Sequence, residues 1–330
     1  MVGCFFGVPF ALLSCRIGVA PCAIEQRENR RFSGIAVWHK INWEVGIVSM
    51  FKILSKERIA PKEYDFWVEA PRIAARTKPG QFVVLRPDEQ GERIPLTIAD
   101  FDASKGAIRI IFQVVGKTTA AMAAMKPGDA ILDISGPLGT PSDIEKLGTV
   151  MMVGGGVGIA ALYPILRALK QAGNKTITIL GGRTSDLVIM KDECAAYSDE
   201  LIITTDDGSA GIKGLVTDAM KEVVARGEKV DHCWAIGPTI MMKFCAKTAE
   251  SLNLPIWVSM NPIMVDGTGM CGCCRLTVDG KIKFGCVDGP EFDGLKVNWD
   301  EFMGRMTQYK EEEKISMEKY EAEVGDLSWL

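Results

Sequence analysis

Histidine is scarce in this 330-residue chain, which contains only His39 and His232. A metal site built from three histidines is therefore impossible within the chain, and a catalytic triad would have to use one of these two residues. The chain also lacks a strong net charge, because 38 Lys and Arg residues oppose 42 Asp and Glu residues. A slightly acidic protein is a poor candidate for nucleic-acid binding through phosphate contacts.

Long hydrophobic runs are missing as well, since no stretch reaches the ~20 uninterrupted apolar residues of a membrane span. The nearest candidate, Met1–Ile24, is interrupted by Pro9 and Arg16 and fits a secretory signal poorly. We interpret residues 1–49 as an N-terminal extension of doubtful structure, and we prefer an upstream start-site artefact to a signal segment, a membrane anchor or a structural arm. We expect a cytoplasmic protein.

Residues 50–146 show the pattern of short β-strands. Glu63–Glu69, Gln81–Leu85 and Ala107–Val115 are short apolar-rich segments separated by Gly/Pro turn signals. One short helix is predicted at Thr118–Met125. Several short strands at close spacing favour an antiparallel barrel or sandwich.

Residues 147–252 alternate strand and helix signals, which predicts a parallel α/β sheet. The apolar run Thr149–Val153 leads through a glycine-rich turn into a helix at Ala160–Ala172. The remaining expected strands are Thr176–Leu180, Leu201–Thr205 and Cys233–Ile236, and the remaining expected helices are Val216–Ala225 and Thr239–Leu252.

Residues 253–300 are rich in glycine and cysteine and cannot form a large core unaided, so a bound metal would supply stability. Residues 301–330 are acidic, and we expect a helix over Gln308–Glu323 within this C-terminal tail. The sequence thus predicts an α+β multidomain protein with an antiparallel β-barrel, a parallel-sheet α/β domain and a small C-terminal domain that binds a metal.

The strongest local signal is a cysteine cluster near the C-terminus. Cys271 and Cys274 form a CxxC pair, and the hairpin expected at Leu276–Phe284 would return Cys286 to them. Thiolates bind iron–sulfur clusters. The alternatives are a Zn²⁺ site and buried free thiols.

Cys273 lies inside the CxxC loop, so we expect its side chain to point away from the shared metal and count three thiolates. Asp266 is the best fourth ligand, although Asp266-Gly267 also fits a plain turn.

The second signal is Gly154-Gly155-Gly156-Val157-Gly158, which stands between an expected strand and an expected helix. Glycines there allow a pyrophosphate to approach the backbone and the helix N-terminus, although a tight strand-to-helix turn explains them too. Gly237-Pro238 forms a second turn at the same sheet edge. Arg183 would predict NADP, whereas Asp206 and Asp207 would favour NAD.

A weaker signal lies on the β-domain. Arg93, Pro95, Leu96 and Thr97 form one motif, and Gly116-Lys117-Thr118-Thr119 leads into the expected short helix. An arginine and a helix N-terminus together make a phosphate site plausible. A surface arginine and a capped helix are the simpler explanation.

Taken in this order, these segments resemble the ferredoxin–NADP reductase superfamily over residues 50–300. The closer similarity is to its iron–sulfur branch, which includes the electron-transfer subunit of dihydroorotate dehydrogenase. The resemblance implies FAD on residues 50–146, held by the arginine motif and the Gly116–Thr119 loop. It further implies a nicotinamide nucleotide on residues 147–252 and a [2Fe-2S] cluster on residues 253–300.

One departure refines the resemblance. Subunits of dihydroorotate dehydrogenase carry four cysteines in this motif, and Asp266 takes the first position here. That pattern is similar to the small subunits of NADH-dependent reduced ferredoxin:NADP⁺ oxidoreductases, also described as sulfide dehydrogenase subunits. This similarity implies NAD rather than NADP, and Asp266, Cys271, Cys274 and Cys286 as cluster ligands. The implied partner is a larger subunit with a second FAD and [4Fe-4S] clusters. The resemblance implies that the pair bifurcates electrons and reaches ferredoxin through that subunit.

Hydride transfer between nicotinamide and flavin needs stacking and orientation rather than a general acid or base, which suits a chain with two histidines. We therefore expect no catalytic side chain. Rival readings are an electron-transfer subunit for dihydroorotate dehydrogenase or for a sulfite reductase, and a zinc-containing nucleotide-binding module.

Overall fold

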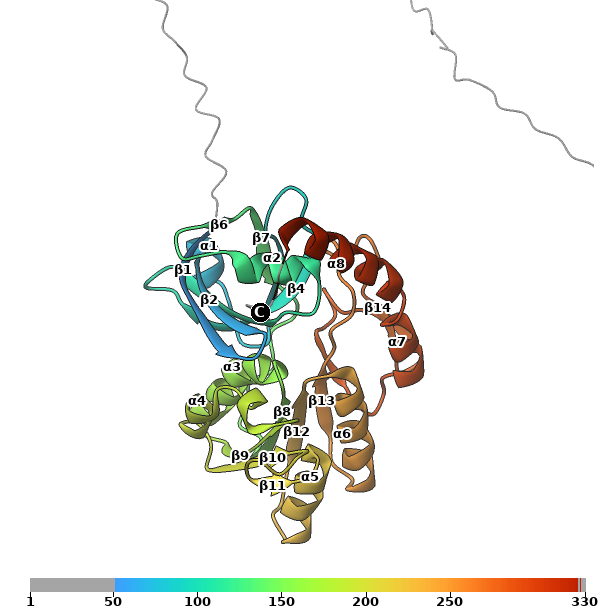
Figure 1. Ribbon diagram of the computed structural model, residues 1–330. Coiled ribbons are helices and arrows are strands. Elements are labelled where there is room, and N and C mark those ends of the chain that lie inside the picture. Colours follow the sequence, from blue (N-terminus) through green and yellow to red (C-terminus); the bar gives the residue numbers. More distant parts are fainter. Residues whose placement is uncertain (1–50, 326, 328–330) are drawn as a thin grey trace, which may run out of the picture. The chain divides into compact units, whose positions relative to one another are not determined.

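The computed structural model describes residues 51–325 and residue 327. The extension expected at residues 1–49 lies outside the described residues. Within the described part, two large sheets and one hairpin account for all the named strands. Figure 1 shows the first sheet at the top of the view and the second below it.

The first sheet is an antiparallel, barrel-like layer of seven strands in the order β6-β1-β2-β5-β4-β3-β7. Alternate residues of its strands, such as Phe66 and Ile110, are fully buried in one apolar core. The helix α2 (Lys117–Ala124) packs against that core through Ala120 and Met122. The strands are β1 (Phe51–Ala60), β2 (Glu63–Glu69), β3 (Phe82–Arg86), β4 (Ile94–Asp102), β5 (Ala107–Gln113), β6 (Ala130–Ile131) and β7 (Asp133–Leu138), with the short helix α1 (Pro71–Ala74) after β2.

The second sheet has the order β11-β10-β9-β8-β12-β13-β16, and every pair in it is parallel except the one with β16. Near-continuous apolar strands such as Val150–Val153 are buried on both faces, as a sheet covered by helices requires. Its strands are β8 (Thr149–Gly155), β9 (Lys175–Gly182), β10 (Glu200–Thr205), β11 (Ile212–Lys213), β12 (His232–Ile236), β13 (Ile256–Ser259) and β16 (Glu291–Asp293).

Helices cover both faces of this parallel sheet. The helices α3 (Gly158–Gln171) and α4 (Lys191–Ala195) pack on one face, and α5 (Val216–Ala225) and α6 (Thr239–Ser251) pack on the other. The chain leaves β8 toward β9 on one side and later returns to β12 on the other. A strand order that reverses beside β8 creates a crevice at the carboxyl ends of the strands, where such sheets bind ligands.

The C-terminal segment ties the two sheets together. Its strands β13 and β16 extend the parallel sheet, although both fall within the residues 253–300 that the sequence assigned to the cluster region. Between them lies the hairpin of β14 (Arg275–Val278) and β15 (Lys281–Phe284), as expected. The chain then forms α7 (Trp299–Arg305) and α8 (Lys310–Val324), and α8 returns to the barrel, where Met317 and Tyr320 contact its core (Figure 1).

The barrel and the parallel sheet meet along an apolar seam. Ala60, Ala99 and Ile111 of the barrel join Ile159 and Ala160 of α3 in one buried cluster. Two ion-pair groups flank the same boundary. In one, Arg167 on α3 contacts Asp100 on β4 at 2.7 Å.

The second ion-pair group centres on Arg109 of β5. Its Nε and Nη2 donate to Asp65 Oδ2 on β2 at 2.9 and 2.7 Å, and its Nη1 donates to Glu193 on α4 at 3.0 Å. The side chains of Arg109 and Asp65 are only 12% and 9% exposed. Arg109 therefore neutralises a buried carboxylate and also bridges the two sheets.

The sequence prediction of an antiparallel barrel followed by a parallel α/β sheet is confirmed. The predicted helix Val216–Ala225 has the observed bounds, and the other helices and strands named in advance begin and end within a few residues of their predicted limits. Several elements were not predicted, namely the strands β1, β4, β6, β7, β11, β13 and β16 and the helices α1, α4 and α7. No helix in the described part of the chain is long and apolar enough to cross a membrane.

Removing Arg109 should destabilise the fold sharply. An Arg109→Met substitution leaves the Asp65 carboxylate buried without a cation, and breaking such a pair costs about 3–5 kcal/mol. Chemical denaturation of the Arg109→Met protein should show this loss. The matched control Glu193→Gln removes the more exposed partner and should cost about 1 kcal/mol or less. Equal losses in the two variants would contradict this account of the seam.

Candidate functional site

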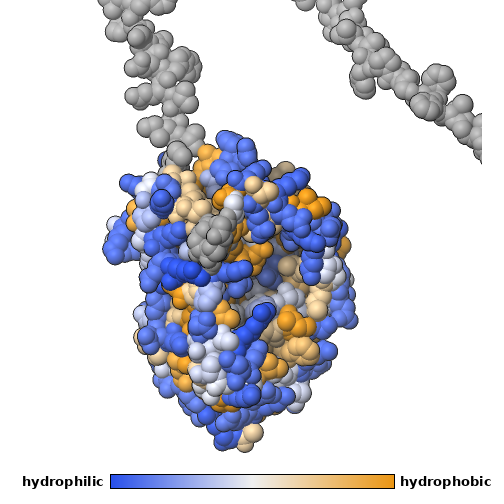
Figure 2. All heavy atoms as spheres, in the orientation of Figure 1, coloured by the Kyte–Doolittle hydropathy of each residue, from blue (hydrophilic) through white to orange (hydrophobic). Residues whose placement is uncertain are grey.

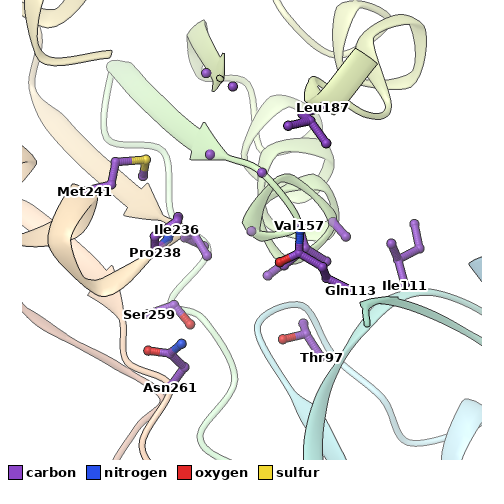
Figure 3. Close-up of a pocket in the computed structure, with 18 of the residues that line it drawn as sticks. Thr97, Ile111, Gln113, Val157, Leu187, Ile236, Pro238, Met241, Ser259 and Asn261 are labelled. Carbon is purple, nitrogen blue, oxygen red and sulfur yellow. The ribbon is translucent and has the colours of Figure 1, made fainter. Parts of the chain in front are cut away.

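A cavity of about 910 Å³ lies between the barrel and the parallel sheet. Figure 2 shows the molecular face that carries this hollow, with hydrophobic side chains on its walls. One wall comes from β4 and β5, and the other comes from the turns that follow β8, β9, β10 and β12. Figure 3 shows Thr97, Ile111 and Gln113 of the barrel approaching Val157 at the start of α3.

The turn after β8 provides the backbone of the second wall. Gly155, Gly156, Val157 and Gly158 line the cavity, whereas Gly154 does not. Gly156 has a φ of +53° and open space at its Cβ position, which leaves room for a ligand against the backbone. This turn leads directly into α3, whose N-terminus favours negative charge.

Close packing makes glycine necessary at Gly158. A Cβ at that position would lie 2.5 Å from Gly237 Cα and 2.6 Å from the Ile236 carbonyl oxygen, so the two turns touch backbone to backbone. Gly237 and Pro238 both line the cavity, as expected from the sequence. The two predicted turns therefore meet at one sheet edge.

The barrel wall contains part of the arginine motif. Pro95, Leu96 and Thr97 lie on β4 and line the cavity, but Arg93 precedes the strand, is exposed and is not among the lining residues. The structure thus brings three of the four predicted residues together at the cavity and leaves the arginine outside it.

The Gly116–Thr119 segment begins α2 and contributes one side chain to the cavity, Thr119. Thr119 Oγ1 accepts hydrogen bonds from the Val115 and Gly116 N–H groups at 3.0 and 3.2 Å, which fixes the start of the helix. Thr118 instead donates to Glu92 at 3.4 Å, and Gly116 leaves open space at its Cβ position. Gly116, Lys117 and Thr118 are not lining residues of the cavity.

Polar residues that follow β9 and β10 reach the far end of the cavity. Arg183 and Asp206 both line it. Asp207 does not, because its carboxylate accepts hydrogen bonds from the N–H and hydroxyl of Ser209 at 2.9 and 2.7 Å. The hydrogen bond from the Ser209 hydroxyl is the largest cause that lowers the pKa of Asp207, and the bond from the Ser209 N–H adds to it. Both bonds hold the turn. Asp206 is therefore the better placed acidic residue.

The cysteine loop forms two pairs of donor atoms. Cys271 Sγ lies 3.3 Å from Asp266 Oδ1, and Cys274 Sγ lies 3.2 Å from Cys286 Sγ. The expected hairpin makes the second pair, because the Gly285 N–H donates to the Cys274 carbonyl at 3.0 Å. No group of three or more metal-binding side chains surrounds a single point in the described residues. Two pairs suit the two irons of a [2Fe-2S] cluster better than a mononuclear zinc site.

Asp266 organises the exposed side of this loop. Its carboxylate accepts hydrogen bonds from the N–H and hydroxyl of Thr268, both at 3.1 Å, and from the Cys271 N–H at 3.2 Å. The backbone bond from Thr268 is the main cause that lowers the pKa of Asp266. On the other side, the Gly269 N–H contacts the Cys286 thiol. Such backbone donors tune the potential of an iron–sulfur cluster.

Cys273 interacts through its thiol with the thiol of Cys271. The expectation that the Cys273 side chain points away from the shared metal stays a prediction. The Cys273 carbonyl accepts a hydrogen bond from Arg305 on α7 at 3.0 Å, which anchors this part of the loop to the C-terminal helices.

Some cavity residues were missed from the sequence. Glu63 and Gln113 face each other across β2 and β5, and Met264 and Phe82 line the opposite end near the cysteine loop. Glu63 begins a predicted strand, and no sequence motif marks it. The others are ordinary strand and loop residues, and only the strand pairing brings them together.

Comparison with known proteins agrees with both parts of the site. Residues 152–247 match the model of an oxidoreductase NAD-binding domain, and residues 261–298 match the iron–sulfur cluster binding domain of dihydroorotate dehydrogenase B. A Thermotoga maritima protein, described as an electron transfer subunit homolog of dihydroorotate dehydrogenase B (NAD(+)), is 56% identical over 86% of this chain and 99% of its own length. The corresponding electron transfer subunit of Bacillus caldolyticus is 33% identical over 73% and 94%.

Similar proteins of solved structure are also oxidoreductases with this fold. One chain in a structure of the NADH-dependent reduced ferredoxin-NADP oxidoreductase, described in terms of flavin-based electron bifurcation, is 57% identical, with a TM-score of 0.79 over 82% of this chain and 98% of that one. A ferredoxin reductase of carbazole 1,9a-dioxygenase, 15% identical with a TM-score of 0.55 over 63% and 67%, shares the fold.

The four paired donors should behave differently from Cys273. Cys271→Ala removes one donor of a pair and should abolish most of the visible iron–sulfur absorption and bound iron of the anaerobically purified protein. The matched control Cys273→Ala should retain both.

Asp266→Cys exchanges an oxygen donor for a thiolate, so it should keep the cluster and shift its reduction potential. Loss of the cluster in Cys273→Ala, or a redox titration of Asp266→Cys that overlays the wild type, would contradict the pairing.

Proposed function

Because the chain belongs to the family of dihydroorotate dehydrogenase B electron-transfer subunits and their homologues, we propose that its cavity holds FAD against the barrel and NAD(H) against the parallel sheet. It is an oxidoreductase subunit whose cofactors are FAD, NAD(H) and a [2Fe-2S] cluster. When bound, FAD supplies the exchange between a hydride and single electrons. The residues assigned to each cofactor below are our proposal.

One observation carries this function. Phe82 and Met264 line the cavity, and the same two side chains pack with Cys274 and Cys286 in one buried cluster. The wall of the cavity and the support of the cysteine pair are therefore a single apolar layer. A cofactor in the cavity and a cluster on the loop would be separated by that layer alone, a short route for electrons that excludes water.

The barrel wall fits a flavin nucleotide. Pro95, Leu96 and Thr97 offer a mostly apolar strip for a flat ring, and Thr119 stands at the start of α2, whose N-terminus favours a phosphate. The open space at Gly116 would admit the chain of the nucleotide. Arg93 is assigned to the same cofactor by family resemblance, and its exposed position would let it reach a pyrophosphate from outside.

The opposite wall fits a nicotinamide nucleotide. The Gly155–Gly158 turn would hold its pyrophosphate, with Gly237 and Pro238 closing the crevice. Asp206 would accept hydrogen bonds from the adenosine ribose and repel a 2′-phosphate, which favours NAD(H). Arg183 lies nearby and would favour NADP(H) if it acted alone. We assign the preference to Asp206, in keeping with the NAD named for the relatives.

These residues bind and orient, and no side chain needs to move a proton during hydride transfer. The apolar lining would exclude water, and the two walls would orient the nicotinamide toward the flavin. Cluster ligation is assigned to Asp266, Cys271, Cys274 and Cys286.

The partner is inferred from the relatives. The 57% identity to a chain of the NADH-dependent reduced ferredoxin-NADP oxidoreductase structure favours a small subunit of such an oxidoreductase. The electron transfer subunit of dihydroorotate dehydrogenase B from Bacillus caldolyticus is only 33% identical, and the 56% identical Thermotoga maritima protein is described as a homolog of that subunit. We propose that a larger flavin and [4Fe-4S] subunit accepts the electrons, bifurcates them and reaches ferredoxin. We also propose a cytoplasmic location, because iron–sulfur ligands and the other described cysteines, none of them in a disulfide, suit a reducing compartment.

A visible absorption spectrum tests this function. The anaerobically purified chain, supplied with FAD, iron and sulfide, should show a flavin band together with broad cluster absorption. Addition of NADH should decrease both, because the cavity delivers electrons from the nucleotide to the cluster. Cys274→Ala should lose the cluster absorption while NADH still bleaches its flavin band.

Two results would contradict the proposal. A colourless protein would favour the zinc module instead. A flavin band that NADH leaves unchanged would exclude the assigned role of the second wall.

A further inference from the structure

Glu63 is a buried acid in the cofactor cavity with a free hydrogen-bonding oxygen. It begins β2, is only 1% exposed and belongs to the lining of the cavity. Its Oε1 accepts a long hydrogen bond of 3.4 Å from Gln113 Nε2 on the paired strand β5. Its Oε2 is buried and has no partner among the described residues.

Among the described residues, no Lys or Arg donates a hydrogen bond to the free Oε2 of Glu63. Asp65 on β2, Arg109 on β5 and Glu193 on α4 bind one another. The paired strand β1 also carries charges: Lys56 donates to the Ala123 and Met125 carbonyls, and Glu57 and Arg58 stand opposite Asp65 and Tyr64 rather than Glu63. The preceding residue, Lys62, is exposed. Burial raises the pKa of Glu63 to about 7. A large share of Glu63 is therefore neutral near pH 7, and the neutral acid carries an O–H that needs an acceptor.

The position of Glu63 points to the cofactors. Gln113 and Ile111 lie on the same outer face of β5, and Figure 3 shows both near Val157 at the start of α3, with Thr97 on the neighbouring strand. Glu63 and Gln113 therefore stand where the barrel wall meets the nucleotide wall. Buried polar groups in native proteins are nearly always hydrogen-bonded, so an orphan oxygen at such a place indicates a ligand contact.

We propose that Glu63, supported by Gln113, is a binding residue of the cavity that pairs with an amide-type edge of a cofactor, namely a carbonyl beside an N–H. A neutral carboxylic acid presents a donor and an acceptor side by side, which matches such an edge. Both the pyrimidine ring of a flavin and the carboxamide of nicotinamide carry one. The inference rests on the proposed function and adds a residue that no sequence motif marks.

The proposal predicts a pH-dependent affinity. The ionised carboxylate cannot donate, so binding should weaken as the pH rises through the pKa of Glu63. For a group that titrates near pH 7, the dissociation constant should rise about tenfold between pH 6 and pH 8. The Glu63→Gln side chain has a similar shape and cannot ionise, so its affinity should not change with pH in this way.

The experiment measures two dissociation constants at pH 6 and pH 8. One is that of FAD for the FAD-free full-length chain, from fluorescence quenching, and the other is that of NAD⁺ for the FAD-loaded chain. Glu69→Gln is the matched control, because Glu69 ends the same strand and is exposed. It should behave like the wild type.

Each outcome is decisive. If the pH dependence of the FAD dissociation constant requires Glu63, the flavin edge is the partner of Glu63. If only the NAD⁺ dissociation constant shows this dependence, the partner is the carboxamide of nicotinamide. Wild-type and Glu63→Gln profiles that coincide in both arms would overturn the proposal. If Glu63→Gln fails to fold, the wild-type protein alone tests the proposal. Dissociation constants for FAD and NAD⁺ that do not change between pH 6 and pH 8 would also overturn it. Failure of the wild-type chain to bind FAD at all would instead contradict the proposed function.

Discussion

The packing of β4 and β5 against α3 is the contact on which the site depends. It buries Ala99 and Ile111 of the barrel with Ile159 and Ala160 of the helix, and so fixes the barrel wall opposite the glycine turn. The apolar part stabilises this contact, since burial contributes about 25 cal/mol per Å². The ion pairs of Arg109 and Arg167 help to fix the orientation of the barrel against the parallel sheet, because each joins a barrel strand to a helix that covers the sheet.

The C-terminal segment converts this two-walled cavity into an electron-transfer site. The chain leaves the parallel sheet after β13, forms the cysteine loop against β3 and β7, and returns to the sheet as β16. This excursion is why Met264 can line the cavity and also support Cys274 and Cys286. The cluster site is thus held by barrel and sheet together, and α8 extends that attachment across the barrel.

Local patterns were sufficient for much of this architecture. The glycine turn after β8 and the hairpin before Cys286 depend on residues close in sequence, so their positions followed from spacing. Spacing could not show which of Asp206 and Asp207 faces the cavity, because that depends on the turn in which Ser209 binds the Asp207 carboxylate. Arg93 was predicted beside its motif, yet the strand begins after it and leaves it outside the cavity lining.

Non-local contacts explain what was missed. Glu63 and Gln113 meet only through the register of β2 and β5, and Met264 reaches the cavity only through the path of the cysteine loop. The three-residue strand β16 is too short for a periodic signal. The assignment of FAD, NAD(H) and a partner required the family, because an apolar crevice with phosphate-binding turns fits many nucleotides.

The central claim is that one cavity holds the nicotinamide and the flavin in a single fixed orientation. Stopped-flow reduction of the FAD-loaded chain by NADH, deuterated on one or the other face of C4, tests this most directly. The account predicts that the flavin band bleaches more slowly with only one of the two labels, because a fixed nicotinamide presents a single face. Equal slowing with both labels would contradict it, because the nicotinamide would then present both faces to the flavin.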